Sequence, residues 1–119
     1  MGFKIDDKDT FLILSPEITD GSKLDDSIDI FLDELNEKFI TFKNKNIILD
    51  FSKFADADVR KILLFSQLSG KQKERDHSFV IVRQGIKVDD IPDEMDITPS
   101  IQEAIDVIEM DSIQRDLGI

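Results

Sequence analysis

Residues 46–51 read NIILDF, and this uninterrupted apolar segment lies near the middle of the 119-residue chain. A run of this kind is typical of a strand buried on both faces of a sheet, because a strand with one solvated face alternates apolar and polar residues. Residues 55–58 (ADAD) follow, and an acidic side chain there is expected to cap a helix running to about Gly70. A buried strand leading directly into a helix indicates an α/β sheet.

The flanking segments extend the same alternation of strands and helices. Apolar residues recur at three- and four-residue spacing over residues 23–39, which predicts an amphipathic helix. Short β-rich runs predict further strands, and the expected strands are residues 3–5 (FKI), 10–14 (TFLIL), 78–82 (SFVIV) and 95–97 (MDI). Residues 71–76 are expected to form a charged loop.

A final helix is expected near the C-terminus. Thr98 is a good N-cap and Pro99 suits the first helical position, while Gly118 marks the helix end. The order of elements therefore predicts one α/β domain over residues 1–119, with a mixed sheet of four to five strands and three to four helices.

Charge and composition restrict the kinds of partner. The net charge is −11, from 26 acidic and 15 basic residues, which opposes binding to phosphate backbones or anionic lipids. A partner with a basic face would be favoured, although solubility alone accounts for the charge equally well. The chain has no cysteine, no signal-peptide core, and apolar runs of only about four residues, far short of a membrane span. We expect a cytoplasmic protein that is not inserted in a membrane and does not bind nucleic acid.

The sequence lacks the residues that most common catalytic sites require. His77 is the only histidine, and it is expected to lie exposed in a loop. The five glycines are too far apart to form a phosphate-binding loop. Asp56 and Asp58 stand at a strand-to-helix turn, where helix capping is the simpler explanation. The chain is therefore predicted not to be an enzyme and to need no cofactor or metal.

Two stretches resemble the STAS family of anti-sigma-factor antagonists. Residues 46–54 (NIILDFSKF), followed by Asp58, are similar to the family's apolar strand ending in Leu-Asp-Leu-Ser, which precedes an Asp-Ser-Ser-Gly-Leu turn. Residues 97–108 (ITPSIQEAIDVI) are similar to the Thr-Pro-Thr and Glu-Ala pattern that opens the family's last helix. The resemblance covers most of the chain and implies a STAS-like domain.

The turn after Asp58 differs from the family pattern at the positions through which the family is regulated. Val59 and Arg60 occupy the two serine positions, and Lys61 occupies the glycine position. In the family the first serine is phosphorylated, which adds about two negative charges and breaks the contact with a kinase-like partner. Val59 has no hydroxyl, so the resemblance implies a STAS-like domain without this switch.

Three functions remain open at this stage. The leading one is a protein–protein interaction module whose partner is a kinase-like anti-sigma factor or another regulator, bound through Asp56, Asp58, Val59, Arg60 and Lys61. The alternative is a STAS-like small-ligand or lipid-binding module, which would require an apolar pocket lined by Phe39, Phe54 or Phe65. A metal- or acid-assisted enzyme built on Asp56 and Asp58 is the third.

Overall fold

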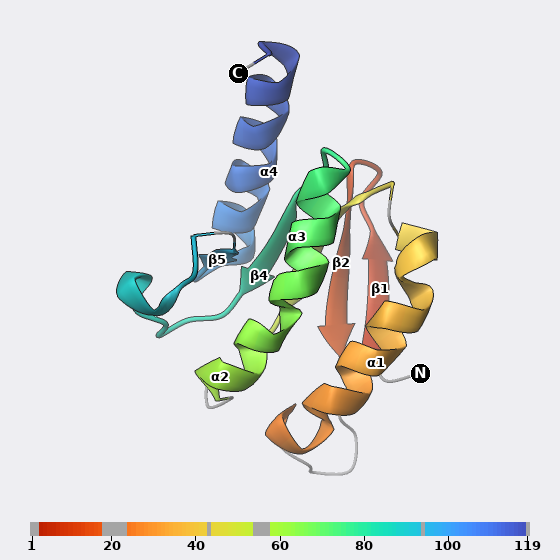
Figure 1. The fold of residues 1–119 in the computed structure, drawn as a ribbon, viewed down its shortest axis with the longest axis vertical. Helices are drawn as coiled ribbons and strands as arrows, with labels where there is room; N and C mark the ends of the chain where they lie inside the picture. Colours follow the sequence, from red (N-terminus) through yellow and green to blue (C-terminus); the bar gives the residue numbers. More distant parts are fainter. Residues whose placement is uncertain (1–2, 18–23, 43, 54–57, 94, 119) are drawn as a thin grey trace.

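The computed structural model describes residues 3–17, 24–42, 44–53, 58–93 and 95–118, leaving aside the side chains of residues 24–30, 39 and 88. Five strands form one sheet and follow their sequence order across it (Figure 1). The strands are β1 (Phe3–Asp7), β2 (Phe11–Pro16), β3 (Asn46–Asp50), β4 (Phe79–Val82) and β5 (Asp96–Thr98). β1 is antiparallel to β2, and the other neighbouring pairs are parallel, so the sheet is mixed as predicted.

Helices follow three of the parallel strands. They are α1 (Leu24–Phe42), α2 (Val59–Ile62), α3 (Ser66–Glu74) and α4 (Ile101–Asp116), with short 3-10 turns at η1 (Leu63–Phe65) and η2 (Val88–Asp90). The α/β class and the element order predicted from the sequence are therefore confirmed.

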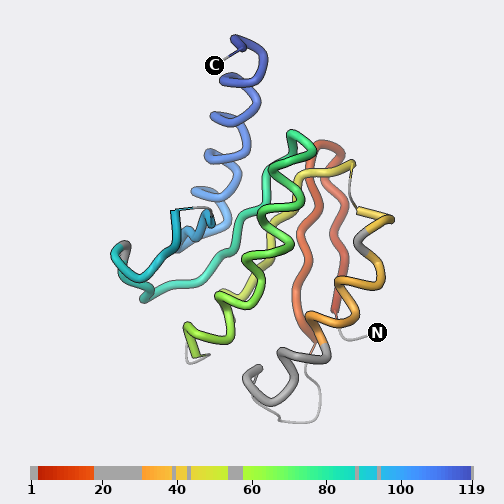
Figure 2. Tube along the Cα trace, viewed as in Figure 1, coloured from red at the N-terminus to blue at the C-terminus, as the bar shows by residue number. Residues whose placement is uncertain are grey.

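Alternation along β3 assigns the two faces of the sheet. Ile47 and Leu49 belong to the core shared with α1, η1 and α3, whereas Ile48 belongs to the core under α4. All three side chains are fully buried, which explains why this strand lacks polar residues in its interior. α4 contacts β3, β4 and β5 and crosses the sheet on the face opposite α1 and α3 (Figures 1 and 2).

Phenylalanine rings form the centre of the larger core. Phe31 of α1 lies 5.8 Å from Phe51 and 5.7 Å from Phe65, measured between ring centroids, and Phe51 lies 5.6 Å from Phe65. The rings are tilted or edge-on to one another, which is the arrangement that aromatic quadrupoles favour. This cluster joins the first helix, the end of the central strand and the η1 turn.

The second helical segment is longer and less regular than predicted. It is interrupted at η1 and then continues through Gly70 to Glu74, so residues 71–74 are helical and the predicted charged loop is wrong there. Gln72 explains the extension, because its side chain is fully buried and its Nε2 donates to the backbone carbonyls of Phe42 and Lys45. Only a helix that continues past Gly70 brings this amide to the end of α1.

The predicted cap of the last helix is also wrong by two residues. Thr98 is the final residue of β5, where its carbonyl accepts from the Arg83 amide, and its hydroxyl donates to the carbonyl of Ser100. Ser100 is the N-cap, with its Oγ accepting from the Glu103 amide at 3.2 Å. Pairing in the sheet takes Thr98 out of the cap position, and the helix begins at Ile101.

Candidate functional site

The turn at the beginning of α2 is organised by one carboxylate. Asp58 has extended backbone dihedrals, and its Oδ1 accepts from the Arg60 amide at 2.9 Å, so Asp58 is the acidic N-cap that was predicted within residues 55–58. The guanidinium of Arg60 also reaches back, with Nη2 lying 3.0 Å from Oδ2 of Asp58. The side-chain and backbone hydrogen bonds from Arg60 hold the pKa of Asp58 below its usual range.

The exposed side of this helical segment is basic with an apolar residue in the middle. The Arg60 side chain is 89% exposed and Leu64 is 46% exposed. Gln67 and Lys71 are exposed further along. We call these four residues, Arg60, Leu64, Gln67 and Lys71, the α2 face. In a chain with net charge −11, this face presents two cations, and the one on Arg60 is paired with Asp58 at the edge of the face.

The structure brings together four of the five predicted partner-binding residues. Asp58, Val59, Arg60 and Lys61 form one turn, in which Val59 and Lys61 are half-buried, and Asp56 lies outside the described residues. Leu64, Gln67 and Lys71 were missed, although the three- and four-residue spacing from Arg60 could have revealed them.

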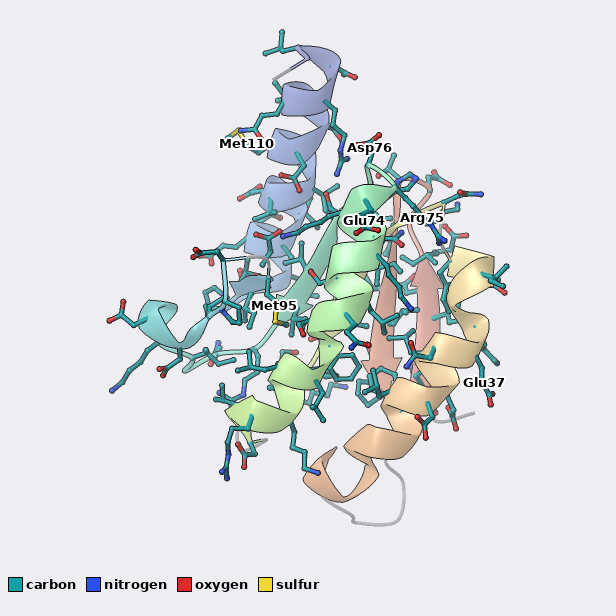
Figure 3. The ribbon with its side chains drawn as sticks, viewed as in Figure 1. Glu37, Glu74, Arg75, Asp76, Met95 and Met110 are labelled. Atoms are coloured by element: carbon teal, nitrogen blue, oxygen red, sulfur yellow. The ribbon has the colours of Figure 1, made fainter. Side chains whose placement is uncertain are left out.

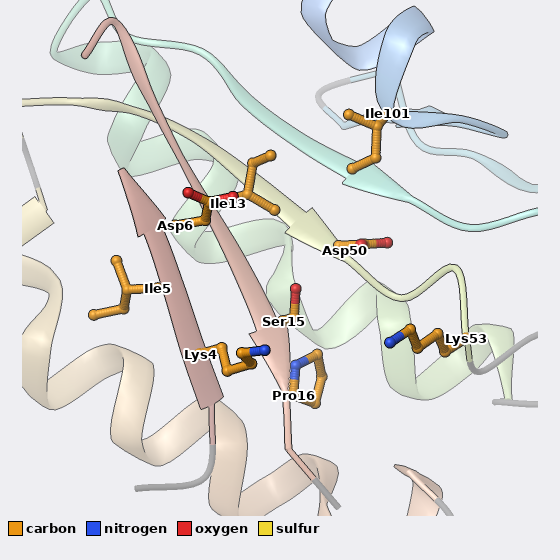
Figure 4. A pocket seen from close by; sticks show the side chains of 9 residues that line it. All are labelled: Lys4, Ile5, Asp6, Ile13, Ser15, Pro16, Asp50, Lys53 and Ile101. Atoms are coloured by element: carbon orange, nitrogen blue, oxygen red, sulfur yellow. The ribbon is translucent and has the colours of Figure 1, made fainter. Parts of the chain in front are cut away.

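A second site occupies the sheet face that α4 leaves open. Register places Lys4 of β1 opposite Ser15 of β2, and Ser15 is one residue beyond the Leu14–Leu49 pair, which sets it beside Asp50 of β3. These side chains border a hollow of about 430 Å³ (Figure 4). Lys53, Ile13 and Ile101 also line the hollow. No sequence motif marks this site, because the strand register that assembles it is a tertiary feature.

The hollow differs from the pocket that a ligand-binding STAS-like module was predicted to have. Phe65 is fully buried in the aromatic cluster and faces no described cavity. Phe54 lies outside the described residues, as does the side chain of Phe39.

A polar network fixes the far half of α4. Ser78 is fully buried, and its Oγ donates to Oδ2 of Asp111 at 2.6 Å. Nη2 of Arg115 donates to the same Oγ at 3.4 Å. Three charged residues, Glu74, Arg75 and Asp76, lie close together at the end of α3 (Figure 3).

His77 lies next to this network in the loop between α3 and β4, as predicted, but its side chain is half-buried and not exposed. Burial, and then the charge of Arg115, lowers the pKa of His77, while Asp76 opposes the shift. The imidazole is therefore held neutral over a wider pH range than a solvated one.

Within the described residues, no group of three or more histidine, aspartate or glutamate side chains is placed to hold a metal ion. Over the same part of the chain, no helix has both the length and the apolar character needed to cross a membrane. The helical pattern of the sequence assigns Asp25, Asp26 and Asp29 to the polar face of a helix. Their side chains are not among those that the structure describes.

No protein-family model matches the chain, and no curated protein matches it at a significant level. The structure itself shows a mixed α/β sheet with two surface features of functional interest, the α2 face and the hollow on the open sheet face.

Proposed function

We propose that the chain is a STAS-type protein–protein interaction module that resembles an anti-sigma-factor antagonist, lacks the phosphorylatable serine, and binds a regulatory protein through the α2 face. The observation that carries the proposal is the exposed Arg60–Leu64 pair beside the Asp58-capped turn. The mixed sheet with helices on both faces also agrees with the STAS resemblance of residues 46–58 and 97–108.

The chemistry of the α2 face selects the partner. Arg60 and Lys71 would meet carboxylates, and Leu64 would enter an apolar socket between them. Central apolar or arginine anchors within a polar rim are the usual source of binding energy in an interface. The remaining surface of the protein is acidic, so a basic patch of this kind also orients the encounter.

The contact proposed here is constitutive. Val59 has no hydroxyl, and the Asp58–Arg60 pair already holds the turn in its capped conformation. Regulation by phosphorylation at this turn is therefore not part of the proposal, and control would reside in the partner.

Co-purification from the native cell tests the proposal. The wild type is compared with Arg60→Glu/Lys61→Glu, which reverses the charge at the turn, and with Lys8→Glu/Arg75→Glu. The control pair changes the charge equally at the other end of the sheet, in the β1–β2 turn and after α3. A stoichiometric partner that binds the wild type and the control, and is lost from the turn variant, is expected.

The binding step is then repeated with the purified partner and Leu64→Ala. A loss of roughly tenfold or more in affinity is expected if Leu64 is an anchor. A partner that tolerates both Arg60→Glu/Lys61→Glu and Leu64→Ala would refute the assigned surface.

A further inference from the structure

The hollow on the open sheet face is lined by charged side chains of both signs and by apolar side chains. Figure 4 shows the ammonium groups of Lys4 and Lys53 reaching toward the same space from opposite sides, with Ser15 and Asp50 beside it. Ile13 and Ile101 lie away from the two ammonium groups, and Asp6 lies beside Ile13 (Figure 4).

The two lysines are available to a ligand. Both are exposed, and in the described part of the chain neither takes part in an ion pair. Asp6, the other carboxylate of the lining, lies 3.4 Å from Lys8 and is occupied by that ion pair. The hollow is therefore bordered by two cations and two carboxylates, of which Asp6 is paired with Lys8.

Asp50 is held in place while keeping an oxygen for a ligand. Its Oδ1 accepts from the Ser52 amide at 3.0 Å, which fixes the side chain at the point where β3 ends. Ligands of parallel sheets commonly lie outside these carboxyl ends of the strands. α4 packs mainly on β3, β4 and β5, with Ile101 at the border of the hollow, so the hollow over β1 and β2 is open to solvent.

We infer that this hollow binds a small zwitterion with an apolar body, such as a free branched-chain amino acid. The ligand carboxylate would lie between Lys4 and Lys53 with the Ser15 hydroxyl donating to it. The ligand ammonium would face Asp50, and the apolar side chain would cover Ile13 and Ile101. Polyanions such as nucleotides are disfavoured, because Asp6 and Asp50 border the same space.

The size of the hollow suits this class. At about 430 Å³ it falls near the lower end of the range for small-molecule pockets, which run from roughly 300 to 1,000 Å³. The site is separate from the α2 face, so the inference does not depend on the proposed protein partner.

Titration of the ¹⁵N-labelled protein with L-leucine, followed through amide chemical shifts, tests the inference. Saturable shifts centred on Ser15, Asp50 and Ile101 are expected. L-Leucinamide lacks the carboxylate and 4-methylpentanoate lacks the ammonium, and each is expected to bind roughly tenfold more weakly.

Variants identify the contacts. Lys4→Gln/Lys53→Gln is expected to raise the Kd for leucine at least about tenfold. Asp50→Asn keeps an acceptor for the Ser52 amide and should weaken leucine more than 4-methylpentanoate. Lys71→Gln removes an exposed cation outside the hollow and should leave the Kd unchanged, as should Arg60→Glu/Lys61→Glu.

Three results would overturn the inference: no shifts at millimolar leucine, shifts centred elsewhere, or a Kd indifferent to the lysine pair. Equal binding of leucine and 4-methylpentanoate would overturn the zwitterion and leave only an anionic amphiphile. Because Arg60 and Lys61 play no part here, failure of this site and failure of the protein-partner proposal are distinguishable.

Discussion

Asp58 and His77 both have a pKa below the ordinary value, and the physical causes differ. For Asp58 the cause is hydrogen bonding from Arg60, which favours the charged carboxylate. For His77 the cause is mainly burial, which disfavours the charged imidazolium. One residue is thus held ionised and the other neutral.

Removing the Arg60 side chain should raise the pKa of Asp58 toward the usual aspartate range. The depressed pKa means that Asp58 stabilises the fold fully above its unfolded-state pKa, and that this contribution is lost as the pH falls through its folded pKa. Carbon-detected NMR titration of Asp58 in the wild type and in Arg60→Ala measures the change. Arg75→Ala serves as the control, and an equal Asp58 pKa in all three proteins would contradict the assignment.

His77 should make the protein less stable as the pH falls from about 7 toward 5. The unfolded chain takes up the proton more readily than the folded one, so the contribution is complete above the unfolded-state pKa and declines below it. His77→Gln should flatten the dependence of the unfolding free energy on pH in this window. Arg115→Gln should raise the His77 pKa, which the imidazole Hε1 resonance reports, and a pKa that does not move would exclude Arg115 as a cause.

At the scale of elements, side-chain hydrogen bonds decide where helices stop and dock. Gln72 draws α3 past Gly70 to the end of α1. The side chain of Asn46 links the beginnings of β2, β3 and β4. Its Nδ2 donates to the Thr10 carbonyl at 3.0 Å, and its Oδ1 accepts from the backbone N–H of Ser78 at 2.8 Å. Ser78 in turn contacts Asp111 of α4.

Ser78→Ala should lower the free energy of unfolding by about 2 kcal/mol, since it removes a buried hydrogen bond to a charged acceptor. Asp111→Asn keeps an acceptor and should cost less. Urea denaturation followed by far-ultraviolet circular dichroism measures both. Equal stability of Ser78→Ala and wild type would show that packing on Val80 and Ile48 alone fixes α4.

On the scale of the whole molecule, the aromatic cluster of Phe31, Phe51 and Phe65 packs α1 and η1 against one face of the sheet. Phe51→Ala should cost about 3–5 kcal/mol, which is a large part of the 5–15 kcal/mol typical of a domain. The chain has no Trp or Tyr, so NMR and circular dichroism are the suitable probes. Coincident transitions by both probes are expected, with a smaller loss for Phe51→Leu. Separate transitions for α1 and α4 would contradict a single cooperative core.

The α/β class, the element order and an acidic helix cap within residues 55–58 could be predicted from the sequence alone. Each depends on local information: apolar periodicity, β-branched runs, and a carboxylate directly before a helix. The Val59–Lys61 departure from the STAS pattern is equally a property of the sequence, while the family assignment and the partner stay proposals.

Only the tertiary structure decided the rest. Whether Gly70 ends a helix depended on a hydrogen bond from Gln72 to residues about 30 positions away, and Thr98 lost the cap position because β5 pairs with β4. The hollow joins Lys4, Ser15, Asp50 and Lys53, whose distances along the chain say nothing of their proximity. Strand register and helix docking arise from burial summed over the whole core, which no local pattern contains.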